Sequence, residues 1–297
     1  MVSLMKFWQS VAFAPSDELV DIARASDRSG WHGLMMSDHL FWPEQHTTAY
    51  PYTADGAPMW EPHTAWPDPW VSMAAMSSVT TNLQFSTNVY IAPARDVMTV
   101  AKQVSTLDVL SGGRASLGVG AGWSADEFAQ TGQNFRTRGA RLNEMIPALR
   151  ELWKDGWSEF HGQHVDFGRL RMEPTPATNI PIYVGGHSPP ALRRAVTLGD
   201  GWIGTGYTPA DGEKIVAEVC GLLDDAGRDR DQFEIIIALY AMPDLELYRH
   251  FEKLGVTGLL WSPWLLADVD DPTFSSPKQA RLAAIERFAE EFVAPLA

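Results

Sequence analysis

The chain has 297 residues, 45% of them hydrophobic and 20% charged, which is enough for a large core in one domain. It carries 23 Lys and Arg against 37 Asp and Glu, and the formal charge of −14 argues against nucleic acid or an anionic membrane as a partner. Its one cysteine, Cys220, permits no intrachain disulfide, which fits a reducing compartment. There is no secretory-signal layout and no uncharged apolar run of about 18 residues, so we expect a soluble cytoplasmic protein without a membrane span.

Short apolar runs alternate with helix-period segments along the chain. Apolar runs without internal alternation are typical of strands buried on both faces. Eight are predicted as strands: residues 7–13, 31–37, 83–91, 114–120, 180–186, 200–206, 233–240 and 256–262. Strand and helix in alternation predict a parallel sheet, closed as a barrel or open and doubly wound. Because no G-x-G-x-x-G follows the first strand, we favour one α/β domain over residues 1–297, a (β/α)8 TIM barrel.

Glycines mark the predicted ends of four helical segments. Each stands between a helix-period segment and the next strand, where a left-handed residue would cap the helix: Gly30, Gly112, Gly199 and Gly255.

Two long segments interrupt the alternation. Residues 41–70, after the second strand, contain four Trp, two Tyr, two His and six Pro. Residues 155–180, before the fifth strand, have the pattern of a hairpin. Long insertions in a compact domain are usually lids or binding loops.

Functional residues of a parallel barrel gather at the C-terminal ends of its strands. The second strand ends in Asp38 and His39. A histidine there can donate or accept a proton near neutral pH, so His39 is the predicted proton-transfer residue. Asp38 would orient His39 or cap the next turn. The alternative is a polar strand end that only satisfies backbone groups.

The aromatic segment that follows predicts a pocket wall for a planar or apolar ligand. We expect substrate contacts from three of its residues: Trp42, Trp60 and His63. Other rings of the segment would complete the wall: Tyr50, Tyr52, Trp66 and Trp70. Alternatively, the loop packs its own rings over the barrel rim.

Two further strand ends are rich in glycine. The fourth strand runs into residues 120–123, where backbone would approach a ligand closely, and Ser124 with Glu127 fits a helix capping box. The fifth runs into residues 185–188 and two prolines. There the serine is a predicted helix N-cap, and the glycine pair leaves the helix N-terminus open to a phosphate.

Signatures of other chemistries are missing. His161 and His164 lack a third ligand at a sensible spacing, and there is no H-E-x-x-H motif or cysteine cluster, so no metal site is expected. The absence of G-x-S-x-G also disfavours a serine hydrolase.

Three segments resemble the luciferase-like flavin and deazaflavin oxidoreductases. Residues 86–128 (STNVYIAPARDVMTVAKQVSTLDVLSGGRASLGVGAGWSADEF) are similar to that family's third strand, third helix and fourth strand. The SDH at 37–39 and GGHSPPALRRAVTLGDGW at 185–202 match in the same order. The Tyr- and Pro-rich insertion is similar to a subgroup that uses the deazaflavin coenzyme F420. The resemblance implies F420 as cofactor, with FMN as the alternative, and a homodimer.

The resemblance also implies roles for particular residues. A non-prolyl cis peptide between Asn88 and Val89 would bulge behind the central ring of the cofactor. Backbone of the glycine-rich strand ends would hold its chain and phosphate: Gly120, Ala121, Gly122 and Trp123, then Gly185, Gly186, His187 and Ser188. His39 would lie near the reactive face with Trp42 as its neighbouring ring.

Other positions bear on the ligands. Trp123 stands where sugar-phosphate dehydrogenases of this family carry a glutamate, which argues against a sugar phosphate as substrate. Arg136, Arg138 and Arg141 are expected contacts for the polyglutamate tail of F420, or else ordinary helix-surface charges.

The resulting hypothesis is hydride transfer between F420 and an apolar or conjugated small organic substrate, with His39 moving the proton. Three alternatives stay open: an FMN-dependent monooxygenase supplied by a separate reductase, a hydrolase using Asp38 and Glu127, and a non-catalytic flavin-binding protein.

Overall fold

The computed structural model describes residues 5–266 and 276–296. In this part of the chain eight parallel strands form one sheet in the order β3-β2-β1-β10-β9-β8-β7-β4. Their bounds are β1 (Lys6–Ser10), β2 (Gly33–Met36), β3 (Gln84–Thr87), β4 (Leu117–Val119), β7 (Ile182–Gly185), β8 (Gly201–Tyr207), β9 (Glu234–Leu239) and β10 (Gly258–Trp261). Each coincides with a predicted strand, β1 and β8 extending one residue beyond the predicted range, so all eight predictions are confirmed.

The sheet closes between its first and last strands. Parallel bridges join Phe85 to Ala115 and Tyr90 to Val119, and they bring β3 beside β4. The predicted (β/α)8 barrel is therefore confirmed, and the open doubly wound sheet is excluded.

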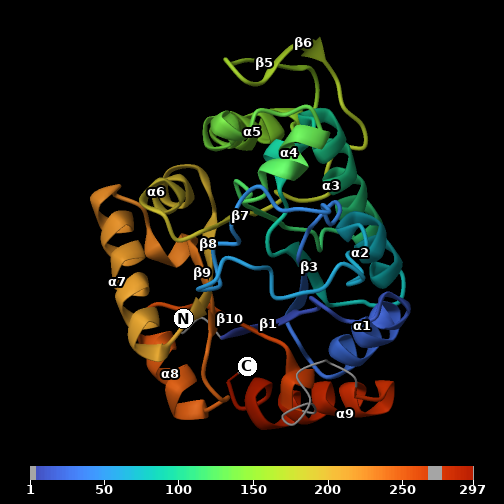
Figure 1. Ribbon diagram of the computed structural model, residues 1–297, viewed down its shortest axis with the longest axis vertical. Coiled ribbons are helices and arrows are strands. Elements are labelled where there is room, and N and C mark those ends of the chain that lie inside the picture. The colour runs from blue at the N-terminus through green and yellow to red at the C-terminus, as the bar shows by residue number, and fades with distance from the viewer. Residues whose placement is uncertain (1–4, 267–275, 297) are drawn as a thin grey trace.

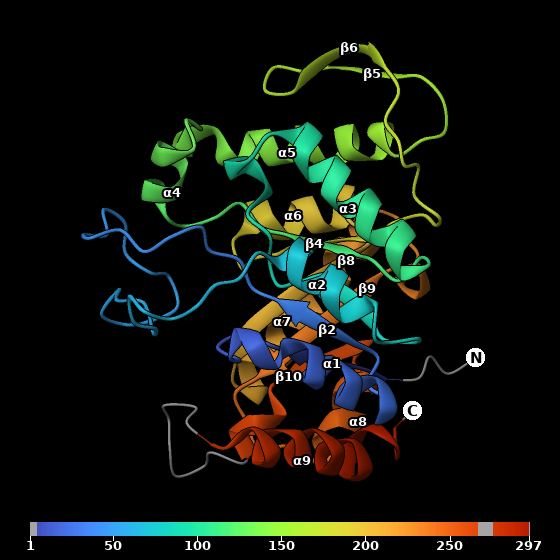
Figure 2. The same ribbon diagram turned by 90° about the vertical axis from the view of Figure 1, so that its right-hand side faces the viewer.

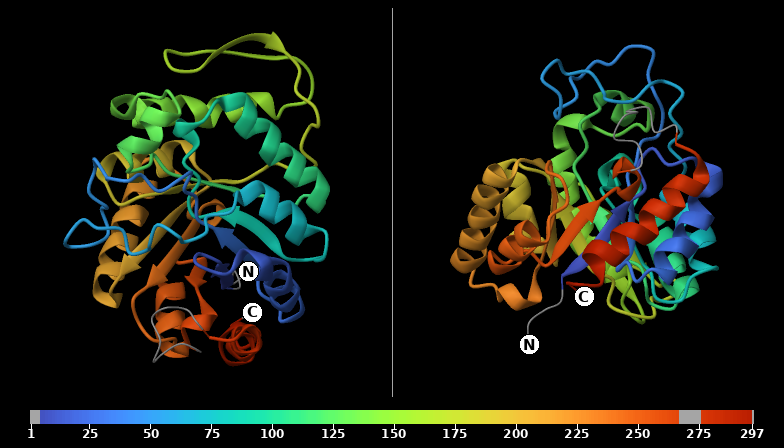
Figure 3. Two further views of the ribbon diagram at one scale, coloured as in Figure 1. Left: turned by 45° about the vertical axis from the view of Figure 1, so that its right-hand side comes forward. Right: turned by 90° about the horizontal axis from the view of Figure 1, so that it is seen from below.

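Helices surround the barrel (Figures 1 and 3). They are α1 (Leu19–Arg28), α2 (Pro69–Ser77), α3 (Val97–Ser111), α4 (Ala125–Gln130), α5 (Arg138–Leu152), α6 (Pro189–Leu198), α7 (Pro209–Asp225), α8 (Leu245–Lys253) and α9 (Lys278–Phe288). Within the described ranges, none of these helices has the length and apolar character to cross a membrane. The predicted hairpin is present as the antiparallel strands β5 (Ser158–His161) and β6 (Asp166–Leu170), which stand apart from the barrel.

Strand side chains divide between two apolar clusters. Phe7, Leu34 and Phe85 pack into the cluster shared with the helices, whereas Trp8 and Met35 belong to the cluster inside the barrel. Burying each such side chain contributes about 1.5–3 kcal/mol, so both layers stabilise the closed sheet. This packing gives the barrel a filled interior below the strand ends.

Three of the four predicted glycine caps are left-handed, with φ of 80° at Gly30, 71° at Gly112 and 101° at Gly255. The prediction is wrong for Gly199, whose φ is −89°. There a side chain is excluded by crowding instead, because a Cβ would lie 2.9 Å from the carbonyl oxygen of Ala195.

The aromatic insertion has no regular helix or strand and ends at Asp68, whose carboxylate accepts a hydrogen bond from the Val71 N–H and caps α2. Figure 2 shows the insertion projecting from the barrel on the side where α4 lies. Trp70, predicted in the pocket wall, belongs to α2 and packs against Tyr90 at 5.2 Å, so that prediction is wrong.

Candidate active site

A cavity of about 1040 Å³ opens at the C-terminal ends of the strands, under the insertion. Single-ligand pockets are roughly 300–1,000 Å³, so this one has room for a cofactor and a substrate together. Most predicted site residues line it: Asp38, His39, Trp60, Asn88, Val89, Gly120, Ala121, Gly122, Trp123, Gly185, Gly186, His187 and Ser188. Trp42 and His63 do not.

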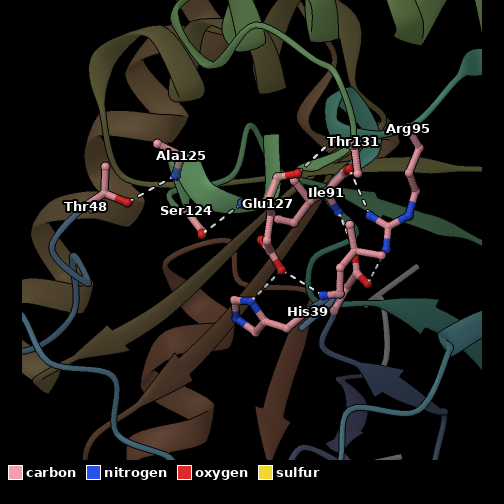
Figure 4. A network of polar contacts seen from close by, with 10 residues as sticks. His39, Thr48, Ile91, Arg95, Ser124, Ala125, Glu127 and Thr131 are labelled. Carbon is pink, nitrogen blue, oxygen red and sulfur yellow. Dashed lines mark hydrogen bonds and ion pairs between the residues drawn. The ribbon is translucent and has the colours of Figure 1, made fainter. Parts of the chain in front are cut away.

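His39 is held by a buried glutamate rather than by its sequence neighbour (Figure 4). Its Nδ1 lies 3.3 Å from Oε1 of Glu127, and the same oxygen accepts a 2.7 Å hydrogen bond from the Leu40 N–H. Glu127 is the third residue of α4, and Ser124 caps that helix by accepting from the Glu127 N–H. The capping box is therefore only half formed, because the glutamate carboxylate points to His39.

Three indole rings surround the His39 imidazole. The ring centroids of Trp60, Trp66 and Trp123 lie 4.7, 4.9 and 5.9 Å from it. Trp42, predicted as its neighbour, lies farther out, 6.3 Å from Trp60.

Two predicted substrate contacts are thus misplaced. Trp42 packs on the ring of His46 at 4.6 Å, and His63 is exposed to solvent away from the cavity. The irregular path of the insertion decides which of its rings turn inward, and Trp60 and Trp66 take that position together with Tyr50 and Tyr52.

Asp38 has a different partner from the predicted one. Its carboxylate accepts from the Ile91 N–H at 2.9 Å and forms a 2.7 Å ion pair with Arg95. Burial raises the pKa of Asp38, and the Arg95 guanidinium opposes that rise. Asp38 therefore fixes the backbone that follows β3, and it does not orient His39.

The peptide bond between Asn88 and Val89 is cis, as the resemblance implied. The Val89 side chain fills the space between two strand ends. A Cβ added to Gly120 would lie 2.4 Å from the Val89 side chain, and one added to Gly185 would lie 2.5 Å from it. These glycines thus make room for Val89 at the floor of the cavity. The Asn88 backbone is held by the carbonyl of Met36 and the hydroxyl of Ser37.

The turn before α6 offers backbone donors to an anion. Ser188 occupies the N-cap position, but its hydroxyl makes no capping hydrogen bond, contrary to prediction. Pro189 and Pro190 follow without N–H groups. The N–H groups of His187 and Ser188 donate to no residue in the described ranges, so they and the Ser188 hydroxyl are free for a ligand.

Arg194, one turn further along α6, is a site residue that the sequence did not reveal. Arg194 lines the cavity and is 7% exposed. Its guanidinium donates to neutral oxygens, those of Asn143 at 2.6 Å and Gly139 at 3.1 Å. Burial lowers the pKa of Arg194, and no carboxylate of the described residues pairs with it. A buried unpaired cation is costly, which indicates an anionic ligand.

Two of the three arginines predicted to bind the cofactor tail, Arg136 and Arg138, line the cavity together with Arg194. Arg138 stacks 3.8 Å above the Phe135 ring and donates to the Gly122 carbonyl, while Arg136 is exposed at the rim. Arg141 instead donates to the backbone carbonyls of His164 and Arg95 and does not line the cavity. We name this region, with Arg136, Arg138, Arg194 and the turn before α6, the cationic side.

The opposite region, the aromatic side, consists of Phe13, Tyr50, Tyr52, Trp60, Trp66 and His39. The two sides meet above the barrel, where the ring of Tyr52 lies 5.2 Å from that of His187. Nδ1 of His187 contacts the Tyr207 hydroxyl, and burial lowers the pKa of this histidine. The insertion therefore roofs the cavity from one side to the other.

Comparison with known proteins identifies the family. The sequence profile of the luciferase-like monooxygenases matches residues 5–244. The chain belongs to that family. It is thus an oxidoreductase enzyme, and the barrel with its cavity is the family's fold.

Three curated relatives are similar over most of the chain. An uncharacterized protein of Mycobacterium tuberculosis is 31% identical over 293 residues, 98% of this chain and 99% of that protein. The F420-dependent hydroxymycolic acid dehydrogenase of the same organism is 31% identical over 218 residues, 72% of this chain and 56% of that enzyme. The F420-dependent glucose-6-phosphate dehydrogenase of Amycolatopsis mediterranei is 28% identical over 289 residues, 94% and 78% of the two chains.

Solved structures share the fold at lower identity. The monooxygenase RslO1 from Streptomyces bottropensis superimposes with a TM-score of 0.72 at 18% identity, over 99% of this chain and 100% of that one. The F420-dependent tetrahydromethanopterin reductase from Methanopyrus kandleri gives 0.72 at 14% identity, also over 99% and 100%. At these identities the likeness shows the fold alone.

Proposed function

We propose that this protein is an F420-dependent oxidoreductase that transfers hydride between the deazaflavin and a small, uncharged, apolar organic substrate. The observation that carries the proposal is the division of one cavity into a cationic side and an aromatic side, with His39 among the rings of the latter. The F420-dependent relatives support the choice of cofactor.

The cationic side fits the phosphorylated chain of the cofactor. The N–H groups of His187 and Ser188 and the unpaired guanidinium of Arg194 would bind the phosphate. Backbone of residues 121–123 would lie along the ribityl chain, and Val89 would support the ring. Arg136 at the rim would meet the anionic tail. When bound, the cofactor supplies the hydride chemistry, and the protein supplies placement.

The aromatic side fits an uncharged substrate. Its lining rings include Phe13, Trp60 and Trp66, and the cavity's arginines all lie on the opposite side. Trp123, in place of a glutamate, adds a further ring instead of a charge. Here His39 would accept or donate the proton, while the roof formed by the insertion excludes water.

The test is a fluorescence titration of the purified protein with F420 and, in parallel, with FMN. Trp60, Trp66, Trp123 and Trp261 line the cavity, so bound cofactor should quench tryptophan emission. We expect micromolar or tighter binding of F420 and at least about tenfold weaker binding of FMN. A preference for FMN would favour a monooxygenase served by a separate reductase, and binding of neither would refute the proposal.

A further inference from the structure

We infer that Glu127 is a positioning residue that sets the tautomer of His39. In this arrangement Nδ1 carries the proton and donates it to Glu127, so Nε2 keeps its lone pair for a reacting group in the cavity. The catalytic meaning of this tautomer rests on the proposed function, whereas the tautomer itself is a property of the protein alone.

One carboxylate oxygen of Glu127 contacts both the backbone and the ring of the His39 segment. Oε1 of Glu127 accepts a 2.7 Å hydrogen bond from the Leu40 N–H, which can only donate. The same oxygen lies 3.3 Å from Nδ1 of His39. An oxygen already acting as an acceptor favours a second donor, so Nδ1 should carry the hydrogen. Across the described ranges no other group forms a hydrogen bond with either ring nitrogen of His39.

Burial strengthens this interaction. The Glu127 side chain is 3% exposed and that of His39 13%, so water competes little for Nδ1. A hydrogen bond to a buried carboxylate is stronger than one between neutral groups, and leaving that carboxylate without donors is costly.

The glutamate is also fixed in place. Ser124 accepts from its N–H, and the Thr131 hydroxyl donates to its carbonyl at 2.8 Å, so both backbone groups are engaged (Figure 4). The preceding residue of α4, Asp126, accepts two hydrogen bonds from Thr47 in the insertion. The first turn of α4 therefore anchors both the histidine and the roof of the cavity.

A fixed tautomer decides what His39 can do. With Nδ1 protonated, the neutral imidazole has its free lone pair at Nε2 and acts there as a proton acceptor; after accepting, it returns the proton from the same atom. With Nε2 protonated instead, the neutral ring could only donate a hydrogen bond from that atom.

Nitrogen-15 NMR of histidine-labelled protein measures the tautomer directly, without cofactor or substrate. The chain has 8 histidines, and a His39→Gln variant assigns the signal. At about pH 8, where an ordinary histidine is neutral, we expect the Nδ1–H form of His39 to predominate. A predominant Nε2–H form would overturn the inference.

Substitutions at two adjacent residues of α4 distinguish a positioning role of Glu127 from a general structural role of the helix. Glu127→Leu removes the acceptor, and the ratio of Nδ1–H to Nε2–H should fall about tenfold or more. Glu127→Gln keeps an acceptor oxygen, so its ratio of Nδ1–H to Nε2–H should stay close to that of the wild type. Asp126→Asn, the same carboxylate-to-amide change one residue earlier, should leave it unaltered.

Each outcome has a distinct meaning. An unchanged ratio in Glu127→Leu would refute the inference. The same loss in Asp126→Asn would show that α4 acts through general structure and would refute it as well. If Glu127→Leu does not fold, the wild-type tautomer and Glu127→Gln still decide. If F420 does not bind, the proposed function is refuted, but the measured tautomer of His39 is unaffected.

Discussion

The cationic and aromatic sides of the cavity are built in different ways. The cationic side uses strand ends, the start of α5 and the N-terminal half of α6, which the barrel holds in place. The aromatic side draws most of its rings from an insertion without regular structure, tied to α4 by Thr47 and Thr48. Under the proposed function, the fold itself would fix where the phosphate of the cofactor binds, whereas the substrate pocket would depend on one loop.

The sharpest test of the division is Arg194→Met. We expect the dissociation constant for F420 to rise about 100-fold, or ~2.7 kcal/mol, because the phosphate loses a buried charged donor. The melting temperature should stay level or rise, since an unpaired buried cation is removed. Fluorescence titration and thermal unfolding measure the two quantities.

Arg193→Met is the matched control for this change. Arg193 is the adjacent residue of α6, is exposed, and does not line the cavity. It should alter F420 binding less than about twofold at physiological salt. If both variants weakened F420 binding equally, only long-range charge would attract the cofactor. The cationic side would then not be a specific binding site.

A substitution on the aromatic side should have a smaller effect, and it should weaken substrate binding instead of cofactor binding. In Trp60→Leu we expect KM for an uncharged alcohol or ketone substrate to rise about tenfold, because a large ring against His39 is lost. F420 binding should change less than twofold. Steady-state kinetics over a panel of uncharged alcohols and ketones, together with the F420 titration, gives both values.

Trp42→Leu supplies the comparison within the same loop, since Trp42 lies one ring farther from the cavity. It should leave both KM and F420 binding close to those of the wild type. Weakened F420 binding in Trp60→Leu, to the level of Arg194→Met, would show that the two sides are not separate.

The same contrast explains how far the sequence could predict the molecule. Strand ends are local features, so the eight strands and the placement of residues 120–123 and 185–188 at the cavity followed from apolar runs, glycines and family resemblance. The contact between His39 and Glu127 joins positions 88 residues apart, and no local pattern records it. The capping-box pattern even suggested a different use for that carboxylate.

The insertion was the least predictable part for a physical reason. Its path is set by tertiary hydrogen bonds such as that from the Ala125 N–H to Thr48, not by periodicity. Composition therefore indicated a pocket of rings but could not tell Trp60 and Trp66 from Trp42. Arg194 was missed because only its burial without a carboxylate distinguishes it from the exposed Arg193.

The smallest expected effect concerns pH and the cationic side. Burial lowers the pKa of His187 below its ordinary value of 6.5, so the unfolded chain binds this proton more readily than the folded protein. The contribution of His187 to stability is thus complete above that value and is lost as the pH falls through it toward the folded pKa. In His187→Gln the free energy of unfolding should decrease less between about pH 7 and pH 5 than in the wild type.

Urea unfolding at several pH values measures this difference. His32, near the opposite end of the barrel, has a pKa lowered to about 4 by burial and contributes with the same sign, but it is present in both proteins and cancels. A parallel loss of stability in the two proteins would mean that His187 is accessible to solvent protons in the fold. The turn before α6 would then be open rather than roofed by Tyr52, and the boundary between the two sides would have to be redrawn there.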